Sequence, residues 1–390
     1  SFDGFSGVQP LNDRFLQTRW QDVEALCRQP VAHMRAQFAQ QLTLTAPGLS
    51  ASGSISIRDG GGLDRARFNA VTVGNWLRGT AELVGRGQAA PAVTVSSGVL
   101  DMRRMPFSSS SGATGSASSG PISLKLDRLQ VTDSIALHRF NGDFSTLGGF
   151  NGKFRGAVNG RTVVRGQVVP KNGGVATRIL SDDAGGVFRS AGALSHGRGG
   201  ELDMTLTPST SQPGEYDGRL KVKNTRAKNA PAIAALINSI SLVGLIDELA
   251  GQGILFTGVE ARFRLGPSYL VVHESSAVGP SIGLSMDGNY NLATGVMNMR
   301  GVLSPIYMLN AIGRVFTRKG EGLIGFAFTL RGTSDDPQVK VNPLSGLAPG
   351  MLREIFRGQA PTIPGQEVIP PTRVEPTDGL TPAQRRSEER

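Results

Sequence analysis

Two different hydrophobic periods follow one another along the chain. Residues 11–41 place apolar side chains such as Phe15 and Phe38 at helical spacing. From Leu42 the period changes to two, because Leu42 and Leu44 alternate with threonines. Strict alternation is typical of a strand that turns one face to apolar surroundings and the other to water. The pattern therefore predicts a helical beginning followed by β-structure.

The alternation is most regular in the second half of the chain. There, apolar residues two apart are separated by polar or charged ones, and short Gly/Asn/Asp turns divide the runs. A sheet with one wet face is the usual result of such a pattern, and it is usually antiparallel. The runs are Ile122/Leu124/Leu126, Leu202/Met204/Leu206, Leu220/Val222, Val259/Ala261/Phe263, Met297/Met299 and Ile324/Phe326/Phe328/Leu330. We therefore predict a mainly β protein.

Three stretches interrupt the strands with helical spacing. The first covers residues 230–249. The second covers residues 304–316, where Ser304 and Pro305 form a favourable helix start, an N-cap followed by proline at the first helical position. The third covers residues 349–356. All three are expected to be amphipathic helices inserted between strands.

Composition divides the chain further. Residues 108–120 are a Ser/Gly/Ala run with nothing to bury, and residues beyond 358 are rich in proline and charge. Neither stretch can build a core. We therefore expect five segments: a helical segment over 1–41, a β segment over 42–107, a linker over 108–120, a β domain with helical insertions over 121–358, and a disordered tail over 359–390.

Residue counts argue against metal and disulfide chemistry. The chain has 52 glycines among 390 residues but one cysteine, Cys27, and four histidines that lie far apart. We expect no metal and no cofactor. The sequence contains no uninterrupted apolar stretch long enough for a membrane-spanning helix. The longest apolar stretch, at residues 230–246, is interrupted by polar residues.

The net charge of +10 permits an anionic partner. Aromatic residues that could stack on bases are not interleaved with the basic ones, so we expect no nucleic acid. A solvated basic face remains one interpretation, and attraction to anionic lipid headgroups remains the other.

The string that looks most like a catalytic motif is Gly-Pro-Ser-Ile-Gly at residues 279–283. A nucleophilic serine of this type needs a strand before it and a helix after it. Here alternating residues follow Ser281, and His273 comes before the serine rather than after it. The favoured interpretation is a turn between two strands. We expect no catalytic residue and no enzyme activity.

One-sided strands leave an apolar face that few helices are available to cover. A second sheet could pack on that face, the sheet could curl on itself, or the face could stay open and hold an apolar ligand. The alternation by itself leaves all three open.

The order of turn and strand motifs in the last part of the chain resembles a known family. The motifs are Gly-Ile-Leu-Phe at 253–256, Arg-Gly-Val-Leu-Ser-Pro at 300–305, Leu-Arg-Gly-Thr at 330–333, Asp-Asp-Pro-Gln-Val at 335–339 and Asn-Pro-Leu-Ser at 342–345. This region, clearest over residues 200–358, resembles the C-terminal region of the AsmA-like family of Gram-negative envelope proteins, in its YhdP-like branch.

The resemblance implies a long twisted antiparallel β-sheet, or groove, with a few amphipathic helices. It implies a non-enzymatic protein of the periplasm, attached to the inner membrane through a segment upstream of Ser1. Its apolar groove would bind phospholipid acyl chains and support lipid transport between inner and outer membrane, and so outer-membrane biogenesis and integrity. A self-packed structural β-protein of the envelope without lipid cargo is the alternative.

The expected site follows from the resemblance and the alternation together. The helix over residues 304–316 would meet a membrane surface or an envelope protein partner through Ile306, Leu309, Ile312 and Phe316. The apolar residues expected to line the lipid-binding groove are Leu202, Met204, Leu220, Val222, Val259, Phe263, Met297, Met299, Phe326 and Phe328.

Overall fold

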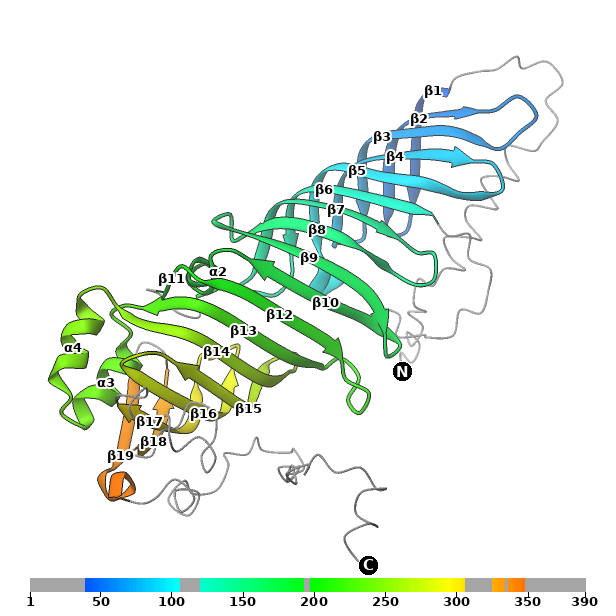
Figure 1. Cartoon of the computed structure of the whole chain (residues 1–390). Coiled ribbons are helices and arrows are strands. Elements are labelled where there is room, and N and C mark those ends of the chain that lie inside the picture. Colours follow the sequence, from blue (N-terminus) through cyan, green and yellow to red (C-terminus); the bar gives the residue numbers. More distant parts are fainter. Residues whose placement is uncertain (1–38, 106–119, 193–196, 306–324, 334–335, 348–390) are drawn as a thin grey trace, which may run out of the picture.

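One open β-sheet of nineteen strands makes up most of the described chain (Figure 1). The computed structural model describes residues 39–105, 120–192, 197–305, 325–333 and 336–347. The sheet is long, twisted and almost entirely antiparallel, and three short α-helices accompany it. This confirms the predicted fold class.

The first half of the sheet contains ten strands. They are β1 (Ala39–Ala46), β2 (Leu49–Ile57), β3 (Leu63–Val73), β4 (Leu77–Arg86), β5 (Ala89–Asp101), β6 (Pro121–Gln130), β7 (Ala136–Ser145), β8 (Asn151–Val158), β9 (Thr162–Lys171) and β10 (Gly174–Ser181). A 3₁₀ turn, η1 (Met102–Arg104), follows β5.

The second half contains the helices. Its strands are β11 (Gly197–Arg198), β12 (Glu201–Pro208), β13 (Tyr216–Ala227), β14 (Ile254–Leu265), β15 (Tyr269–Val278), β16 (Ile282–Asn291), β17 (Met297–Pro305), β18 (Phe326–Gly332) and β19 (Pro337–Asn342). The helices are α2 (Ala184–Ser190), α3 (Pro231–Ser239) and α4 (Val243–Ala250), and a 3₁₀ turn, η3 (Pro343–Leu347), follows β19.

Strands that follow one another in sequence are neighbours in the sheet, as expected of a meander. The exceptions are β10, which pairs with β12, and the short β11, which pairs with β13. All strand pairs are antiparallel except β5 and β6, which pair in parallel. A parallel pair needs a long crossover connection, and residues 102–120, which include the whole expected linker, provide it. The β segments on the two sides of residues 108–120 therefore join in one sheet.

Three hydrophobic clusters occupy one face of this sheet. The first lies between β4 and β10, and the second lies around Ala184 of α2, Leu202 and Val222. The third collects side chains from β14 to β19 together with α3 and α4. Helix α3 follows β13 in sequence but packs against β19, so the sheet must curve until its last strands approach that helix.

Two helix predictions need correction. The expected helix over residues 230–249 is two helices, because α3 ends where the Leu242 amide donates to the Ile237 carbonyl (3.3 Å) and Ser241 adopts a left-handed conformation (φ 57°). Apolar spacing continues through this break, so the pattern could not reveal it. The expected helix start at Ser304 is also wrong, since Ser304 and Pro305 continue β17 opposite Gly283 and Ile282.

Boundaries also differ at the start of the sheet. Strand β1 begins at Ala39, where the helical pattern was expected to continue to residue 41. The first expected helix up to residue 38, the disordered tail over 359–390, and residues 306–316 and 349–356 lie outside the described residues.

Candidate functional site

Cross-strand pairing gives the sheet one continuous apolar face. Residues directly opposite one another share a face, and one such row runs through Leu202, Val222, Val259, Ala277, Leu284, Leu303 and Phe326. Equivalent rows pair Ile55 with Ala66, Ala66 with Leu83, and Leu83 with Val93 near the other end. The apolar face therefore extends from β1 to β19.

The ten residues expected to line a groove all lie on this apolar face. Four of them, Leu202, Val222, Met299 and Phe328, are buried at 7% exposure or less. The other six, Met204, Leu220, Val259, Phe263, Met297 and Phe326, are half-buried. The structure brings the ten together on neighbouring strands, and buries part of the set against other protein atoms.

Aromatic rings on the apolar face lie over glycines of the next strand. A Cβ atom added to Gly166 would stand 2.1 Å from the ring of Phe154, which is its cross-strand partner. A Cβ added to Gly218 would stand 2.1 Å from the ring of Phe263, again its partner. Each large ring thus rests on a neighbour that has no side chain.

Four phenylalanines form a stacked row in the middle of the sheet. Ring centroids are 5.7 Å apart for Phe140 and Phe154, 6.4 Å for Phe140 and Phe144, and 5.0 Å for Phe144 and Phe150. Offset stacking of this kind adds stability beyond area burial. The hydrophobic pattern did not reveal this row of rings. Its residues lie on β7, β8 and the turn between them, so they come together only when the two strands pair.

Cover over the apolar face is uneven. We call β12–β19 with α3 and α4 the packed region, and here Ile237, Ile254 and Ile282 are at most 1% exposed. We call β1–β3 the open region. Among the described residues, it contributes no side chain to any of the three hydrophobic clusters.

Residues of the open region were absent from the expected site. Leu44, Ile55 and Phe68 lie on its apolar face and are half-buried. The signal that could have found them is the same alternation, which begins at Leu42. The resemblance directed attention to the later strands instead.

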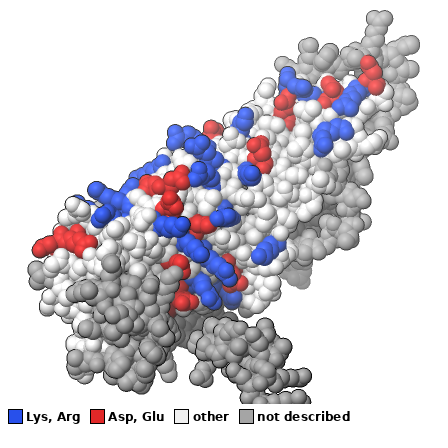
Figure 2. Space-filling view, viewed as in Figure 1, with Lys and Arg blue, Asp and Glu red and all other residues white. Residues whose placement is uncertain are grey.

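Charged residues occupy the opposite, polar face, where basic and acidic side chains lie interspersed in a band along the molecule (Figure 2). Arg178 binds both carboxylate oxygens of Asp203 at 2.9 and 2.7 Å, and this hydrogen bonding lowers the pKa of that carboxyl. In the same way Arg67, helped by Arg65, lowers the pKa of Glu82. These ion pairs connect neighbouring strands on the polar face.

The catalytic-looking string is a hairpin turn. The Gly279 amide donates to the Ile282 carbonyl at 2.9 Å, and strands β15 and β16 flank Ser281 directly. No helix follows the serine, so the interpretation as a turn is confirmed. His138 and His273 lie in strands β7 and β15.

Other candidate residues lie outside the described part of the chain. These are Cys27 and the four residues of the expected membrane or partner helix, Ile306, Leu309, Ile312 and Phe316. Within the part that the structure describes, no group of three or more His, Cys, Asp or Glu side chains could hold a metal ion. None of the described helices has the length and apolar character that a bilayer crossing requires.

Comparison with known proteins gives no relative. No family model, no curated protein and no solved structure matches the chain. The family resemblance therefore stays a prediction, and the argument for function depends on the sheet itself.

Proposed function

We propose that the apolar face binds the acyl chains of phospholipids and supports their transport between two membranes. The observation that carries this proposal is an open sheet whose apolar face is continuous over nineteen strands, and whose strands β1–β3 contribute no side chain to a described hydrophobic cluster. Apolar surface of that extent on a folded protein usually marks an interaction site.

The dimensions of the sheet suit this cargo. At roughly 4.8 Å per strand, its strands span about 80 Å along the sheet. A single acyl chain reaches about 15 Å, half of the ~30 Å hydrocarbon core of a bilayer. Several lipids therefore fit one behind another, with their chains on the apolar face and their headgroups in water.

The side chains of the apolar face also suit the movement of bound lipid along the sheet. Burial of each CH₂ group contributes about 0.8 kcal/mol wherever the surface is apolar. The open region offers mostly small or medium side chains, including the half-buried Leu42, Leu44 and Ile55. A uniform surface holds a chain without one deep minimum, so bound lipid can slide along it. No bond is made or broken, and the proposal assigns no catalytic residue.

The packed region would then close one end of the path. Ile237 of α3 and Leu249 of α4 lie in the cluster that also holds Leu303 and Phe328. Lipid would enter over the open region and leave before this cluster, or would displace α3 and α4. The proposed contact with a membrane or an envelope partner through residues 306–316, and the proposed periplasmic location, remain predictions of the resemblance.

Lipid extraction from the purified full chain tests the proposal. We expect phospholipid to co-purify and to appear as bound mass in native mass spectrometry. A chain that is folded by circular dichroism and carries no lipid, even after incubation with phospholipid vesicles, would favour the self-packed structural protein instead.

A photo-crosslinking amino acid distinguishes the two faces of one strand. Placed at Phe68, on the apolar face of β3, it should crosslink to phospholipid. Placed at the adjacent Arg67, which points to the polar face and binds Glu82, it should not. The pair Phe263 and Arg262 repeats the test on β14. Equal crosslinking from both faces would contradict binding on the apolar face.

A further inference from the structure

The two long edges of the sheet are built differently (Figure 1). At one edge, strands β10 and β13 end and lead into the three described helices, α2, α3 and α4. The other edge carries hairpin turns, including those between β7 and β8 and between β16 and β17, and no helix among the described residues. We call them the helical edge and the turn edge.

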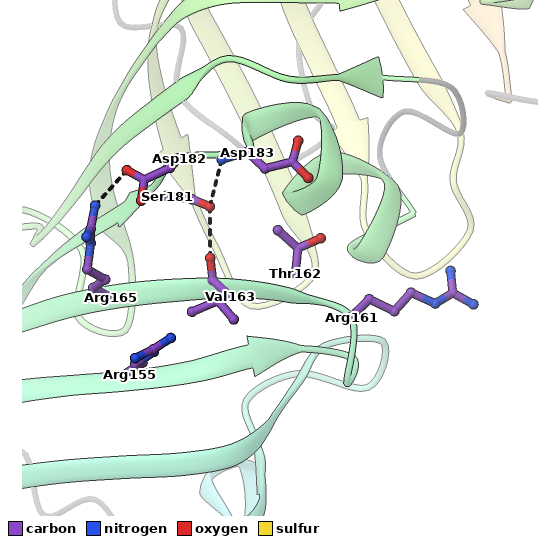
Figure 3. A pocket seen from close by; sticks show the side chains of 8 residues that line it. All are labelled: Arg155, Arg161, Thr162, Val163, Arg165, Ser181, Asp182 and Asp183. Carbon is purple, nitrogen blue, oxygen red and sulfur yellow. Dashed lines mark hydrogen bonds and ion pairs between the residues drawn. The ribbon is translucent and has the colours of Figure 1, made fainter.

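The helical edge gives no apolar approach to the sheet beside α2. A hollow of about 480 Å³ there is lined mainly by charged and hydroxyl side chains. Figure 3 shows Arg161 extending away from Arg155 and Arg165. Asp182 already engages Arg165 at 2.6 Å. Helix α2 packs against β9 here, and Val164 of that strand is 2% exposed. Charge and a helix therefore close this edge.

The turn edge exposes apolar side chains at the β7–β8 turn. Leu147 is 71% exposed, the largest value among the described large apolar residues, and Phe150 is 37% exposed. The Asn151 side-chain amide donates to the carbonyls of Leu147 and Gly149 at 3.0 and 2.8 Å. The Gly149 amide donates to the Thr146 carbonyl at 3.2 Å. These bonds close the turn while the Leu147 side chain stays in the solvent.

Phe150 connects this turn to the middle of the apolar face. Its ring stacks on that of Phe144 with centroids 5.0 Å apart, and Phe144 stacks on Phe140 at 6.4 Å. Exposure falls along this row to 8% at Phe144 and 4% at Phe140. Single exposed apolar residues are ordinary on protein surfaces. Here, however, a line of apolar side chains leads from the exposed turn into the hydrophobic cluster between β4 and β10.

Positive charge lies beside the same turn. A Cβ atom added to Gly149 would stand 2.8 Å from Pro170, so the turn packs against the end of β9, where the next residue is the exposed Lys171. Lys153 of β8 is also exposed, and Asp143 lies directly opposite it. One lysine therefore remains in excess. An apolar tip beside a lysine suits a bilayer surface, where the ammonium group meets lipid phosphates and the apolar side chain enters the hydrocarbon boundary.

We propose that the β7–β8 turn inserts into the surface of a phospholipid bilayer, with Leu147 and Phe150 at the hydrocarbon boundary and Lys171 at the phosphate groups. The row of rings then gives acyl chains a path from the bilayer to the apolar face. That path rests on the proposed function. Contact of the turn with the bilayer does not require the sheet to carry lipid, and it is separate from the contact expected of residues 306–316.

Flotation of the full chain with vesicles of phosphatidylethanolamine and phosphatidylglycerol measures this contact. Leu147→Ser should weaken vesicle binding about tenfold, since most of the leucine surface leaves water on insertion. The hydrogen bonds of the turn use backbone groups of Leu147, so they remain in this variant. The control is Leu292→Ser, in the β16–β17 turn of the same edge, where the leucine is 43% exposed. It should bind vesicles like wild type.

The charge has its own variant. Lys171→Gln should weaken binding to these anionic vesicles about fivefold, the scale of one lysine near an anionic surface, and should leave binding to phosphatidylcholine vesicles unchanged. An equal effect on both kinds of vesicle would remove Lys171 from the contact.

Tryptophan in place of leucine reports insertion directly. Leu147→Trp should add emission that phospholipids brominated on their acyl chains quench, whereas the added emission of Leu292→Trp should not be quenched. Wild-type binding by Leu147→Ser, or equal losses in the two serine variants, would overturn the bilayer contact. A Leu147→Ser variant that loses self-association in size-exclusion chromatography and keeps vesicle binding would assign the turn to a second copy instead.

Failure of the proposed function gives a different result. Vesicle binding that depends on Leu147, without phospholipid crosslinked at Phe68, would support the bilayer contact and count against transport. Phospholipid crosslinked at Phe68 in a chain that does not float with vesicles would overturn the contact and leave the proposed function standing.

Discussion

The open region and the packed region carry the same alternation but differ in what lies over it. In β2, Ile55 is half-buried and belongs to no cluster, whereas Ile254 in β14 is fully buried beneath helical side chains. The packed region gains its cover from curvature of the sheet and from α3 and α4. No described helix packs on the open region. One sequence pattern thus produces a core at one end and, at the other, an apolar face that joins no described hydrophobic cluster.

The comparison suggests that the packed region serves stability and the open region serves ligand binding. Burial in the packed region stabilises the fold, since fully burying one large aliphatic side chain contributes about 1.5–3 kcal/mol. The side chains of the open region gain less of this burial free energy. Their apolar area is therefore available to a ligand under the proposed function. Four experiments test the contrast.

The largest expected effect comes from matched isoleucines. Ile254→Ala should lower the free energy of unfolding by about 2–5 kcal/mol, because it leaves a cavity in a filled core. Ile55→Ala should cost about 1 kcal/mol or less, because its site is already partly exposed. Urea unfolding followed by circular dichroism measures both. Equal costs would remove the distinction between the two regions.

The next effect concerns the glycines beneath the aromatic rings. Gly218→Ala should destabilise the chain by about 1–3 kcal/mol, because the new methyl group must displace the ring of Phe263. Gly258→Ala is the control on the neighbouring strand, where a Cβ atom meets nothing within 4 Å. Thermal unfolding compares the two variants. A harmless Gly218→Ala would show that the ring does not depend on that space.

A charge placed in the open region should affect lipid more than stability. Leu44→Glu puts a carboxylate on the apolar face of β1, where covering it with an acyl chain costs more than the 1.4 kcal/mol that a tenfold change requires. Bound phospholipid should fall about tenfold or more. Thr45→Glu, one residue along and on the polar face, should leave lipid content unchanged. A similar loss in both variants would indicate general damage to β1.

A charge on a ring of the packed region extends this test. Phe263→Glu or Phe326→Glu should also block lipid if the path continues into β14–β18. If only the open region carries lipid, these two variants will keep their lipid content. The two results separate a path along the whole sheet from binding at one end.

The smallest expected effect depends on pH. The folded-state pKa of Asp203 lies below its ordinary value because Arg178 binds the carboxylate, so the pair contributes stability above about pH 4 and loses it as pH falls through the lowered pKa. Asp203→Asn should therefore be slightly less stable than wild type at neutral pH and equal to it in acid. Both side chains are more than a third exposed, which keeps the difference small.

Glu82 provides the same comparison in the first half of the sheet. Its pKa is lowered by Arg67, and Glu82→Gln should show the same pH dependence. Thermal unfolding at a series of pH values measures both variants. A difference that grows in acid would contradict the sign of either pair.

Local sequence signals predicted the strands well and the helices poorly. Alternation located the paired strands around Leu202, Leu220 and Val259. The helix start at Ser304 failed because capping preferences are worth little beside the ladder that joins β17 to β16. The pairing of Phe154 with Gly166 could not be predicted, since its two residues meet only once the register of β8 and β9 is set.

The sequence by itself determined which side chains share a face, because the period of two in a strand is a local property of the backbone. Only the tertiary structure decided which part of that face is covered. Cover depends on curvature and on contacts between residues far apart in the chain, such as those of α3 with β19. The tertiary structure also placed Arg155 directly opposite Arg165, since the register between β8 and β9 is set by the whole sheet.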